Sequence, residues 1–201
     1  TRTINPSVPQ GHDLYLALQV LRHEQPRLRA RNLAEQLSVS EGELLACRVG
    51  EDVVQLRTDW SELLPALIEL GEVMALTRNA HCVHERHGHY GETTVMPSGK
   101  MGLVLSPDID LRLFLGGWKS AFAVTEETKR GTQRSLQFFD AQGVAAHKVY
   151  LTDNSKVDAW PELLARFAAP EQQAVLAVEP AVAKPAELAD SEIDVADLRE
   201  R

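Results

Sequence analysis

Leucines recur at helical spacing near the start of the chain, at positions 14, 18 and 21. This spacing puts them on one face of an amphipathic helix over residues 13–23. Asp13 is placed to cap that helix, and Pro26 follows where the helix must end. The chain is therefore expected to open with a short helix that buries a single leucine face.

Further helices are indicated by a capping pattern that occurs twice. Ser40 is followed three places later by Glu43, and the same spacing precedes a leucine-rich stretch near residues 60–70. In a capping box, each of the two side chains accepts a hydrogen bond from the backbone N–H of the other residue, which favours a helix start. The sequence predicts three short helices within residues 13–47 and a later one near residues 60–70.

From residue 71 the hydrophobic pattern shortens to that of β-strands. Apolar or alternating runs are separated by turn signals such as Pro97-Ser98-Gly99. The runs lie too close together for crossover connections, which need about a dozen residues or more, so neighbouring strands are expected to be antiparallel. The predicted strands are residues 53–56, 72–77, 82–85, 92–96, 101–105, 109–115, 121–125, 134–139 and 144–151.

The last part of the chain changes character twice. Helical spacing returns over residues 155–168, and the composition beyond Pro170 is rich in Ala, Pro, Val and Glu, as in a linker. The predicted fold class is α+β, with N-terminal short helices followed by a large antiparallel β-sheet covered by helices. One domain is expected over residues 1–169, followed over residues 170–201 by a linker and the beginning of another repeat. The natural polypeptide is expected to continue past Arg201.

Composition narrows the classes of function. Twenty-nine acidic residues outnumber 21 basic ones, and the net charge of −8 gives no positive field for general binding of nucleic acid or membrane surfaces. Cys47 and Cys82 form no CxxC pair, so neither a disulfide framework nor a zinc knuckle is indicated. No apolar run approaches the roughly 20 residues that cross a bilayer, and residues 1–10 lack an export signal. A cytoplasmic location is expected.

Histidines are the most conspicuous candidate ligands, because four lie within nine residues: His81, His84, His87 and His89. We expect a hairpin with its tip at Gly88, in which no pair has the spacing of metal ligands with a third partner nearby. A solvated hairpin is favoured over a metal site, and no metal ligand is predicted. Another histidine, His147, is expected on the sheet face of Ala145, Val149 and Leu151, as a core histidine with its polar atoms satisfied.

Arg112 interrupts an apolar strand that ends in a Gly-Gly turn. Strand alternation puts Arg112 and Phe114 on the same face. Such a pair can hold a flat anionic macrocycle. The aromatic ring stacks on the apolar body of the macrocycle, while the guanidinium pairs with a carboxylate or polarises bound water. An ion pair of Arg112 with Asp108 or Asp110 is the alternative.

Residues 30–49 have the pattern of a helix-turn-helix. Glu41 and Glu43 stand at the start of the would-be recognition helix, where they repel phosphates. Basic side chains nevertheless surround the segment: Arg22, Arg27, Arg29, Arg31 and Arg48. A structural helical pair is preferred, and DNA-linked regulation through promoter DNA is the alternative.

Several separated motifs resemble one family. They are residues 33–50, Gly71-Glu-Val-Met-Ala-Leu-Thr-Arg-Asn79 with His84-Glu85, Asp110-Leu-Arg-Leu-Phe114, Arg134-Ser-Leu-Gln-Phe-Phe-Asp140 and His147-Lys-Val-Tyr150. In this order, over about residues 13–167, they resemble the HemS/PhuS/ShuS family of hemin-degrading factors. The chain is similar to the N-terminal repeat of these two-repeat α+β proteins.

The resemblance implies a cytoplasmic protein of bacterial heme uptake, which binds heme and carries it towards heme oxygenase. In this family an Arg-x-Phe strand motif lines the distal side of the heme, and it corresponds here to Arg112 and Phe114. The proximal iron ligand is a histidine at the beginning of the second repeat, after a segment like residues 193–199, so the axial histidine is expected beyond the end of this chain.

The family name also implies hemin degradation as an alternative activity. The chain has no recognisable motif for a catalytic acid, base or redox cofactor, and no catalytic residue is predicted. A homodimer of the chain, in which a second copy replaces the missing repeat, is left open.

Overall fold

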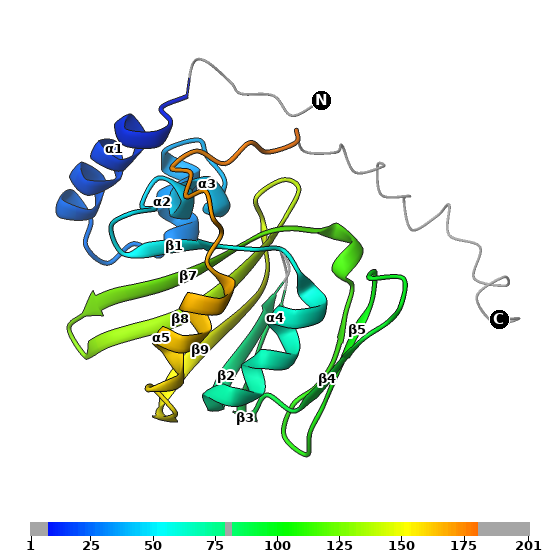
Figure 1. Cartoon of the computed structure of the whole chain (residues 1–201). Coiled ribbons are helices and arrows are strands. Elements are labelled where there is room, and N and C mark those ends of the chain that lie inside the picture. The colour runs from blue at the N-terminus through cyan, green and yellow to red at the C-terminus, as the bar shows by residue number, and fades with distance from the viewer. Residues whose placement is uncertain (1–7, 79–81, 181–201) are drawn as a thin grey trace, which may run out of the picture.

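The centre of the protein is an antiparallel sheet of six strands (Figure 1). The structure is a computed structural model and describes residues 8–78 and 82–180. In spatial order the strands are β1 (Val53–Leu56), β7 (Trp118–Thr128), β8 (Gly131–Asp140), β9 (Ala145–Ser155), β2 (Gly71–Arg78) and β3 (Val83–His89). A small second sheet contains β4 (Glu92–Val95), β5 (Gly102–Leu105) and β6 (Asp110–Leu113).

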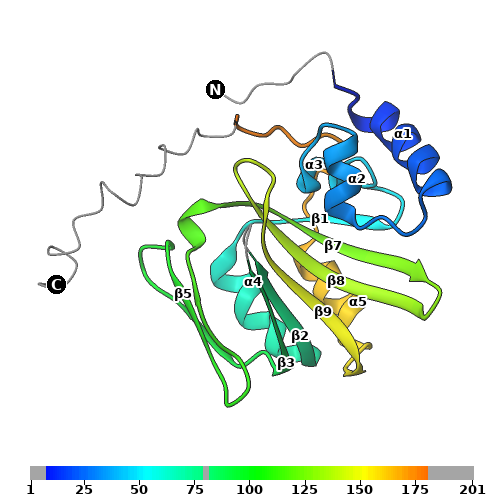
Figure 2. The same cartoon turned by 180° about the vertical axis from the view of Figure 1, so that it is seen from behind.

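Helices cover the large sheet on both of its faces (Figures 1 and 2). The inner face packs against the small sheet and against α4 (Trp60–Ala66), the 3-10 turn η1 (Leu67–Leu70) and α5 (Ala159–Phe167). At one end of the opposite face lies a group of three helices that we call the helical cap: α1 (Gly11–Glu24), α2 (Ala30–Gln36) and α3 (Glu41–Ala46). The predicted α+β fold class, with short helices before a large antiparallel sheet, is confirmed.

Strand alternation explains why the large sheet has two buried faces. In β7, Ala121 and Ala123 belong to the inner core, whereas Phe122 and Val124 belong to the cluster beneath the helical cap. We call this second face the cap face. Because successive side chains of a strand point to opposite sides, one strand contributes to both cores. The small sheet completes the inner core, and the 3-10 turn η2 (Leu115–Gly117) joins β6 to β7.

The helical cap is built much as the leucine pattern predicted. Leu14 and Leu18 of α1 pack against Leu33 and Leu44 in one buried cluster. The capping box of α3 is present, since Ser40 Oγ accepts a hydrogen bond from the Glu43 backbone at 3.2 Å. The expected cap at Asp13 is wrong, because α1 begins two residues earlier and places Asp13 inside its first turn. An acidic side chain is favourable there, near the positive end of the helix dipole.

The expected hairpin tip at Gly88 is also wrong. Gly88 lies inside β3, where it pairs with Val73, and the chain reverses between Arg78 and Val83. A Cβ at Gly88 would come within 2.2 Å of the Asp108 Cβ. Glycine therefore serves here for close packing of the β5–β6 loop against β3, not for a turn.

The stretch after α5 lies against the body of the protein as far as residue 180. Gln172 bonds both backbone groups of Gln55 in β1, and the backbone N–H of Glu179 donates to the carbonyl of Ala141 at 2.7 Å. The expected start of a further repeat falls in residues 181–201, which lie outside the described residues. The division at residue 169 thus stays a prediction.

Candidate functional site

The small sheet has one buried face and one exposed face. Val104 of β5 and Leu113 of β6 point into the inner core, where they are 0% and 4% exposed. Their neighbours point outward: Leu105 is 55% exposed and Met101 is 37% exposed. Apolar side chains are normally buried, so an apolar strip on the outer face of a sheet indicates a ligand-binding or interaction surface.

The predicted pair of residues lies at the edge of this strip. Arg112 is exposed in β6, and Phe114 follows the last residue of that strand with 70% of its surface exposed. Both stand on the opposite side from the buried Leu113. Arg112 pairs across to Leu103 of β5, whose side chain lies on the same side of the sheet. We call the exposed group the Arg112 face: Met101, Leu103, Leu105, Arg112 and Phe114.

The guanidinium of Arg112 is available to a ligand. Within residues 8–78 and 82–180, no hydrogen bond or ion pair engages the side chain of Arg112, although Asp108 and Asp110 are close in sequence. The alternative of an ion pair with either carboxylate is therefore not what the structure shows. A free cation beside an apolar strip suits a flat molecule that carries an anionic edge.

The loop before β6 is tied to the large sheet and so sets the position of the Arg112 face. Arg86 Nε donates to the carbonyl oxygen of Asp108 at 2.7 Å. Ser106 Oγ donates to the His89 carbonyl at 3.0 Å and accepts from the Ile109 backbone N–H at 2.9 Å. These bonds join the β5–β6 loop to β3, which makes β6 part of a rigid frame.

A buried polar pair lies in the inner core beneath the small sheet. The Tyr90 hydroxyl and His147 Nε2 are 3.2 Å apart, and the imidazole stacks near Trp118 and Phe138 with both centroids at 6.0 Å. Burial lowers the pKa of His147 to about 4, and the nearby Leu76 backbone opposes this only in part. The imidazole is neutral at physiological pH, so His147 is a core histidine, as the sequence predicted. The expectation that its polar atoms are satisfied is wrong, because Nδ1 is buried and has no hydrogen-bond partner among the described residues.

One detail of that prediction is corrected. Val149 shares the inner core with His147, but Ala145 belongs to the cluster beneath the helical cap. The reason is a register shift in the β8–β9 pairing, where Phe138 faces His147 and the next residue, Phe139, already faces Ala145. An irregularity of this kind reverses the alternation that periodicity assumes.

The exposed histidines do not gather into a metal site in the described part of the chain. His84, His87 and His89 lie along β3, which is an edge strand, and His81 lies outside the described residues. Among the residues described, no group of three His, Cys, Asp or Glu side chains could hold an ion.

The helix-turn-helix pattern forms two real helices, but α3 is not free to enter a groove. Its residues Leu44, Leu45 and Ala46 are buried against the rest of the protein. Arg48 is only 4% exposed and is held by Asp52 and Glu126, so it cannot reach a phosphate. Arg29 and Arg31 are exposed. The pattern is better explained by helix packing than by DNA recognition.

Sequence reasoning missed the apolar part of the Arg112 face. Met101, Leu103 and Leu105 alternate with Gly102 and Val104. That alternation was a sufficient signal for two faces, but it cannot tell which face is covered. The pairing of β5 with β6 decides that the three larger side chains accompany Arg112.

Comparison with known proteins agrees with this fold. A family model described as "Haemin-degrading HemS.ChuX domain" matches residues 38–167. The chain belongs to the HemS/ChuX family. The family predicted from the separated motifs is therefore confirmed. No helix in the described part is long and apolar enough to cross a membrane.

Two curated relatives come from Yersinia. The chain is 47% identical over 168 residues to the hemin transport protein HmuS of Yersinia pestis, an alignment that covers 83% of this chain and 48% of that protein. It is 48% identical over 145 residues to the hemin transport protein HemS of Yersinia enterocolitica, with 72% and 41% covered. The chain spans about half the length of the curated relatives it matches.

Solved structures show the same relationship. Holo-PhuS, a heme-binding protein from Pseudomonas aeruginosa, matches with a TM-score of 0.86 and 63% identity, covering 93% of this chain and 54% of that one. The heme-degrading enzyme ChuS of Escherichia coli matches with a TM-score of 0.74 and 40% identity, covering 85% and 52%. ChuX, at 17% identity and a TM-score of 0.62, shows a shared fold alone, although 96% of its chain is covered.

Proposed function

We propose that this protein binds heme on the Arg112 face as part of cytoplasmic heme trafficking. The observation that carries the proposal is the exposed guanidinium of Arg112, which has no partner among the described residues, beside the 70% exposed ring of Phe114 on an apolar strip. Its relatives named as hemin transport and heme-binding proteins support heme as the ligand. Phe114 and the strip would hold the porphyrin by apolar contact, and Arg112 would bind a carboxylate or a water molecule beside it.

The roles of these residues follow from their chemistry. A phenyl ring and aliphatic side chains remove apolar porphyrin surface from water, at about 25 cal/mol per Å². A guanidinium orients a water molecule or a carboxylate without competing for the iron, since it has no lone pair to donate. The chain therefore supplies orientation and cover for the porphyrin.

Delivery to heme oxygenase is the activity that best fits such a surface. A carrier must release its ligand, and a site that covers one face without ligating the iron permits exchange. Heme degradation is the second candidate, because ChuS is named a heme-degrading enzyme and shares 40% identity. Product analysis with reductant and catalase tests the degradation candidate, since enzymatic turnover persists in catalase whereas peroxide-driven heme damage does not.

Heme titration tests the proposal directly. The chain is titrated alone, and also continued through a second repeat like that of its longer relatives, while the Soret band is followed. Arg112→Ala and Phe114→Ala are each expected to weaken binding about ten-fold, the equivalent of one charge-assisted hydrogen bond or a partly buried ring. Arg130→Ala removes an exposed arginine from the β7–β8 turn and serves as the matched control. Equal heme affinity of the unaltered chain and of all three variants contradicts the proposal.

Two other partners receive less support. DNA binding would need a free helix, and α3 is packed with its arginine neighbour Arg48 buried. A homodimer would let a second copy face the Arg112 surface, and light scattering with and without heme measures that directly. The proposed function requires neither.

A further inference from the structure

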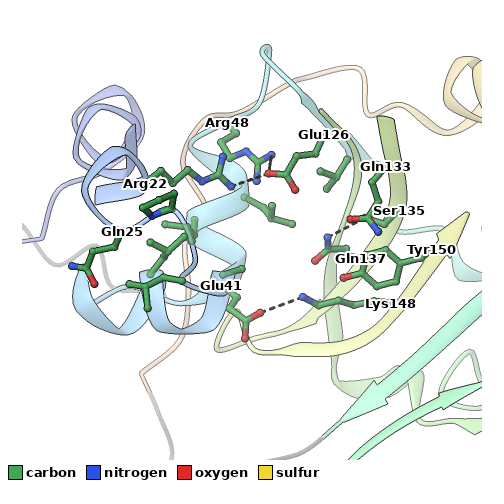
Figure 3. Close-up of a pocket in the computed structure, with 17 residues that line it drawn as sticks. Arg22, Gln25, Glu41, Arg48, Glu126, Gln133, Ser135, Gln137, Lys148 and Tyr150 are labelled. Atoms are coloured by element: carbon green, nitrogen blue, oxygen red, sulfur yellow. Dashed lines mark hydrogen bonds and ion pairs between the residues drawn. The ribbon is translucent and has the colours of Figure 1, made fainter. Parts of the chain in front are cut away.

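A cleft lies between the helical cap and the cap face of the large sheet (Figure 3). Its volume is about 380 Å³, within the range of pockets that hold small molecules. Helices α1–α3 form one wall, and strands β7, β8 and β9 form the other. The Arg112 face is built from other strands, so the cleft is a separate site.

The strand wall of the cleft is polar although it is buried. Ser135 is 3% exposed, and Gln137 and Lys148 are each 8% exposed. Elsewhere the same face carries Phe122 and Phe139, which is the usual composition of a sheet under helices. Buried polar groups cost free energy unless they are hydrogen-bonded. Among the described residues, no polar side-chain atom that lines the cleft is fully buried without a partner, so the unpaired atoms of this wall face the open space of the cleft.

The protein itself satisfies only some of these groups. The Gln137 amide donates to Ser135 Oγ at 3.1 Å, and the Lys148 ammonium donates to Glu41 at 3.2 Å. No other hydrogen-bond partner of the Lys148 ammonium, the Gln137 carbonyl oxygen or the Tyr150 hydroxyl exists among the residues described. An ammonium has three donors, so Lys148 keeps two for a ligand. Lys148 pairs with Gln137 across the strands and adjoins Tyr150, which groups these donors and acceptors at one place.

The charges around the cleft limit what the ligand can be. Three basic side chains, Arg22, Arg48 and Lys148, and two acidic ones, Glu41 and Glu126, line it. Glu126 is already held by both arginines, at 3.0 and 3.1 Å. Two charged neighbours also pair with these groups, Asp52 with Arg48 and Arg78 with Glu41, and their charges cancel. An excess of one positive charge remains, in a chain of net charge −8. One carboxylate would balance it, whereas a phosphate dianion would add two charges beside two carboxylates.

The helical wall supplies the apolar half of the site. Leu28, Leu33 and Leu44 face the strands across the cleft. We propose that the cleft binds a small organic monocarboxylate, whose carboxylate is held by Lys148 and whose apolar body packs against Leu33 and Leu44. The ligand thus has a charged end that meets the polar strand wall and an apolar end that meets the helical wall.

Burial adds a pH dependence to this site. It lowers the pKa of Lys148 to about 8, with a smaller contribution from Arg78. Glu41 of α3 accepts a hydrogen bond from the ammonium, and Tyr150 of β9 lines the same cleft. A carboxylate needs the protonated form, so its affinity is expected to fall as the pH rises above 8.

Titration with a matched pair of probes tests the proposal on the 201-residue chain. The probes are 3-phenylpropionate and its neutral amide, 3-phenylpropionamide, observed by amide chemical shifts in heteronuclear NMR. The acid is expected to shift the resonances of Ser135, Gln137 and Lys148 and to bind about ten-fold more tightly than the amide, the value of one charge-assisted hydrogen bond. Equal affinity of the two probes, or shifts located elsewhere, overturns the proposal.

Variants assign the effect to the ammonium. Lys148→Met keeps the aliphatic stem and should bind the acid no better than the amide, whereas Lys129→Met removes an exposed lysine from the β7–β8 turn and should change nothing. Equal loss in both variants contradicts the proposal. If Lys148→Met does not fold, the acid and amide comparison in the unaltered chain still decides. Arg112→Ala should leave the acid affinity unchanged, so this site and the heme surface can fail independently.

Discussion

The Arg112 face and the cap-face cleft depart from ordinary packing in opposite directions. The Arg112 face exposes Leu105 and Phe114 and carries a cation for which the described part of the chain provides no partner. The cleft buries Arg48 and Lys148 and ties each of them to carboxylates. An exposed apolar surface contributes little to the stability of the monomer, whereas a buried ion pair is costly to break. Substitutions in the two regions should therefore separate binding from folding.

The largest expected effect is on folding, at the edge of the cleft. Arg48→Ala leaves Asp52 and Glu126 without their shared guanidinium and is expected to lower the free energy of unfolding by about 3 kcal/mol. That value is at the low end for a broken buried pair, because the two carboxylates are 33% and 35% exposed. Urea denaturation measures it. The exposed control Arg130→Ala should change stability by less than about 0.5 kcal/mol, and a comparable loss there would show that burial is not the cause.

The second effect concerns the buried His147 beneath the small sheet. Its pKa of about 4 in the folded protein lies below the ordinary value of 6.5, so the unfolded chain binds a proton first as the pH falls. The contribution is fully present above pH 6.5 and is lost as the pH falls to 4. Between pH 7 and 4.5 the loss is expected to be about 2 kcal/mol. His147→Phe should show a pH dependence smaller by that amount, and identical slopes for both proteins would refute a neutral imidazole.

A third effect probes the frame that holds the Arg112 face. Gly88→Ala places a methyl group 2.2 Å from the Asp108 Cβ and is expected to destabilise the protein by about 1–3 kcal/mol. Gly117→Ala is the matched control, since nothing lies within 4 Å of the added carbon. Thermal unfolding compares the two. If the control is destabilised as much, close packing at Gly88 is not the reason.

The smallest effect on folding is expected on the Arg112 face itself. Arg112→Ala and Phe114→Ala should each change the free energy of unfolding by less than about 0.5 kcal/mol, because both side chains are exposed. Urea denaturation of the variants measures this change, and the heme titration of the same variants measures their weakened heme affinity. A large loss of stability would mean that these residues serve the fold rather than a ligand.

Local patterns determined part of the structure directly. The start of α3 after Ser40 follows from hydrogen bonds between residues three places apart. The common side of Arg112 and Phe114 follows from the alternation of side chains along a strand. Both features depend on local backbone geometry. The family was likewise recognised from motifs in their order along the chain.

The remaining features depended on which distant segments meet. Gly88 looks like a turn glycine, and only its approach to Asp108 shows that it lies inside a strand. Periodicity put Ala145 on the face of His147, and only the register shift opposite Phe139 moved it to the other core.

The amino-acid sequence by itself determined the α+β class, the start of α3 after Ser40 and the placement of Arg112 beside Phe114. The tertiary structure alone decided that Met101, Leu103 and Leu105 extend that pair into a surface, and that Glu41 reaches Lys148 across 107 positions of chain. The physical reason is that periodicity reports the direction of each side chain relative to its own backbone. What covers a side chain, or pairs with its charge, is set by strand register and helix packing between residues far apart in the chain.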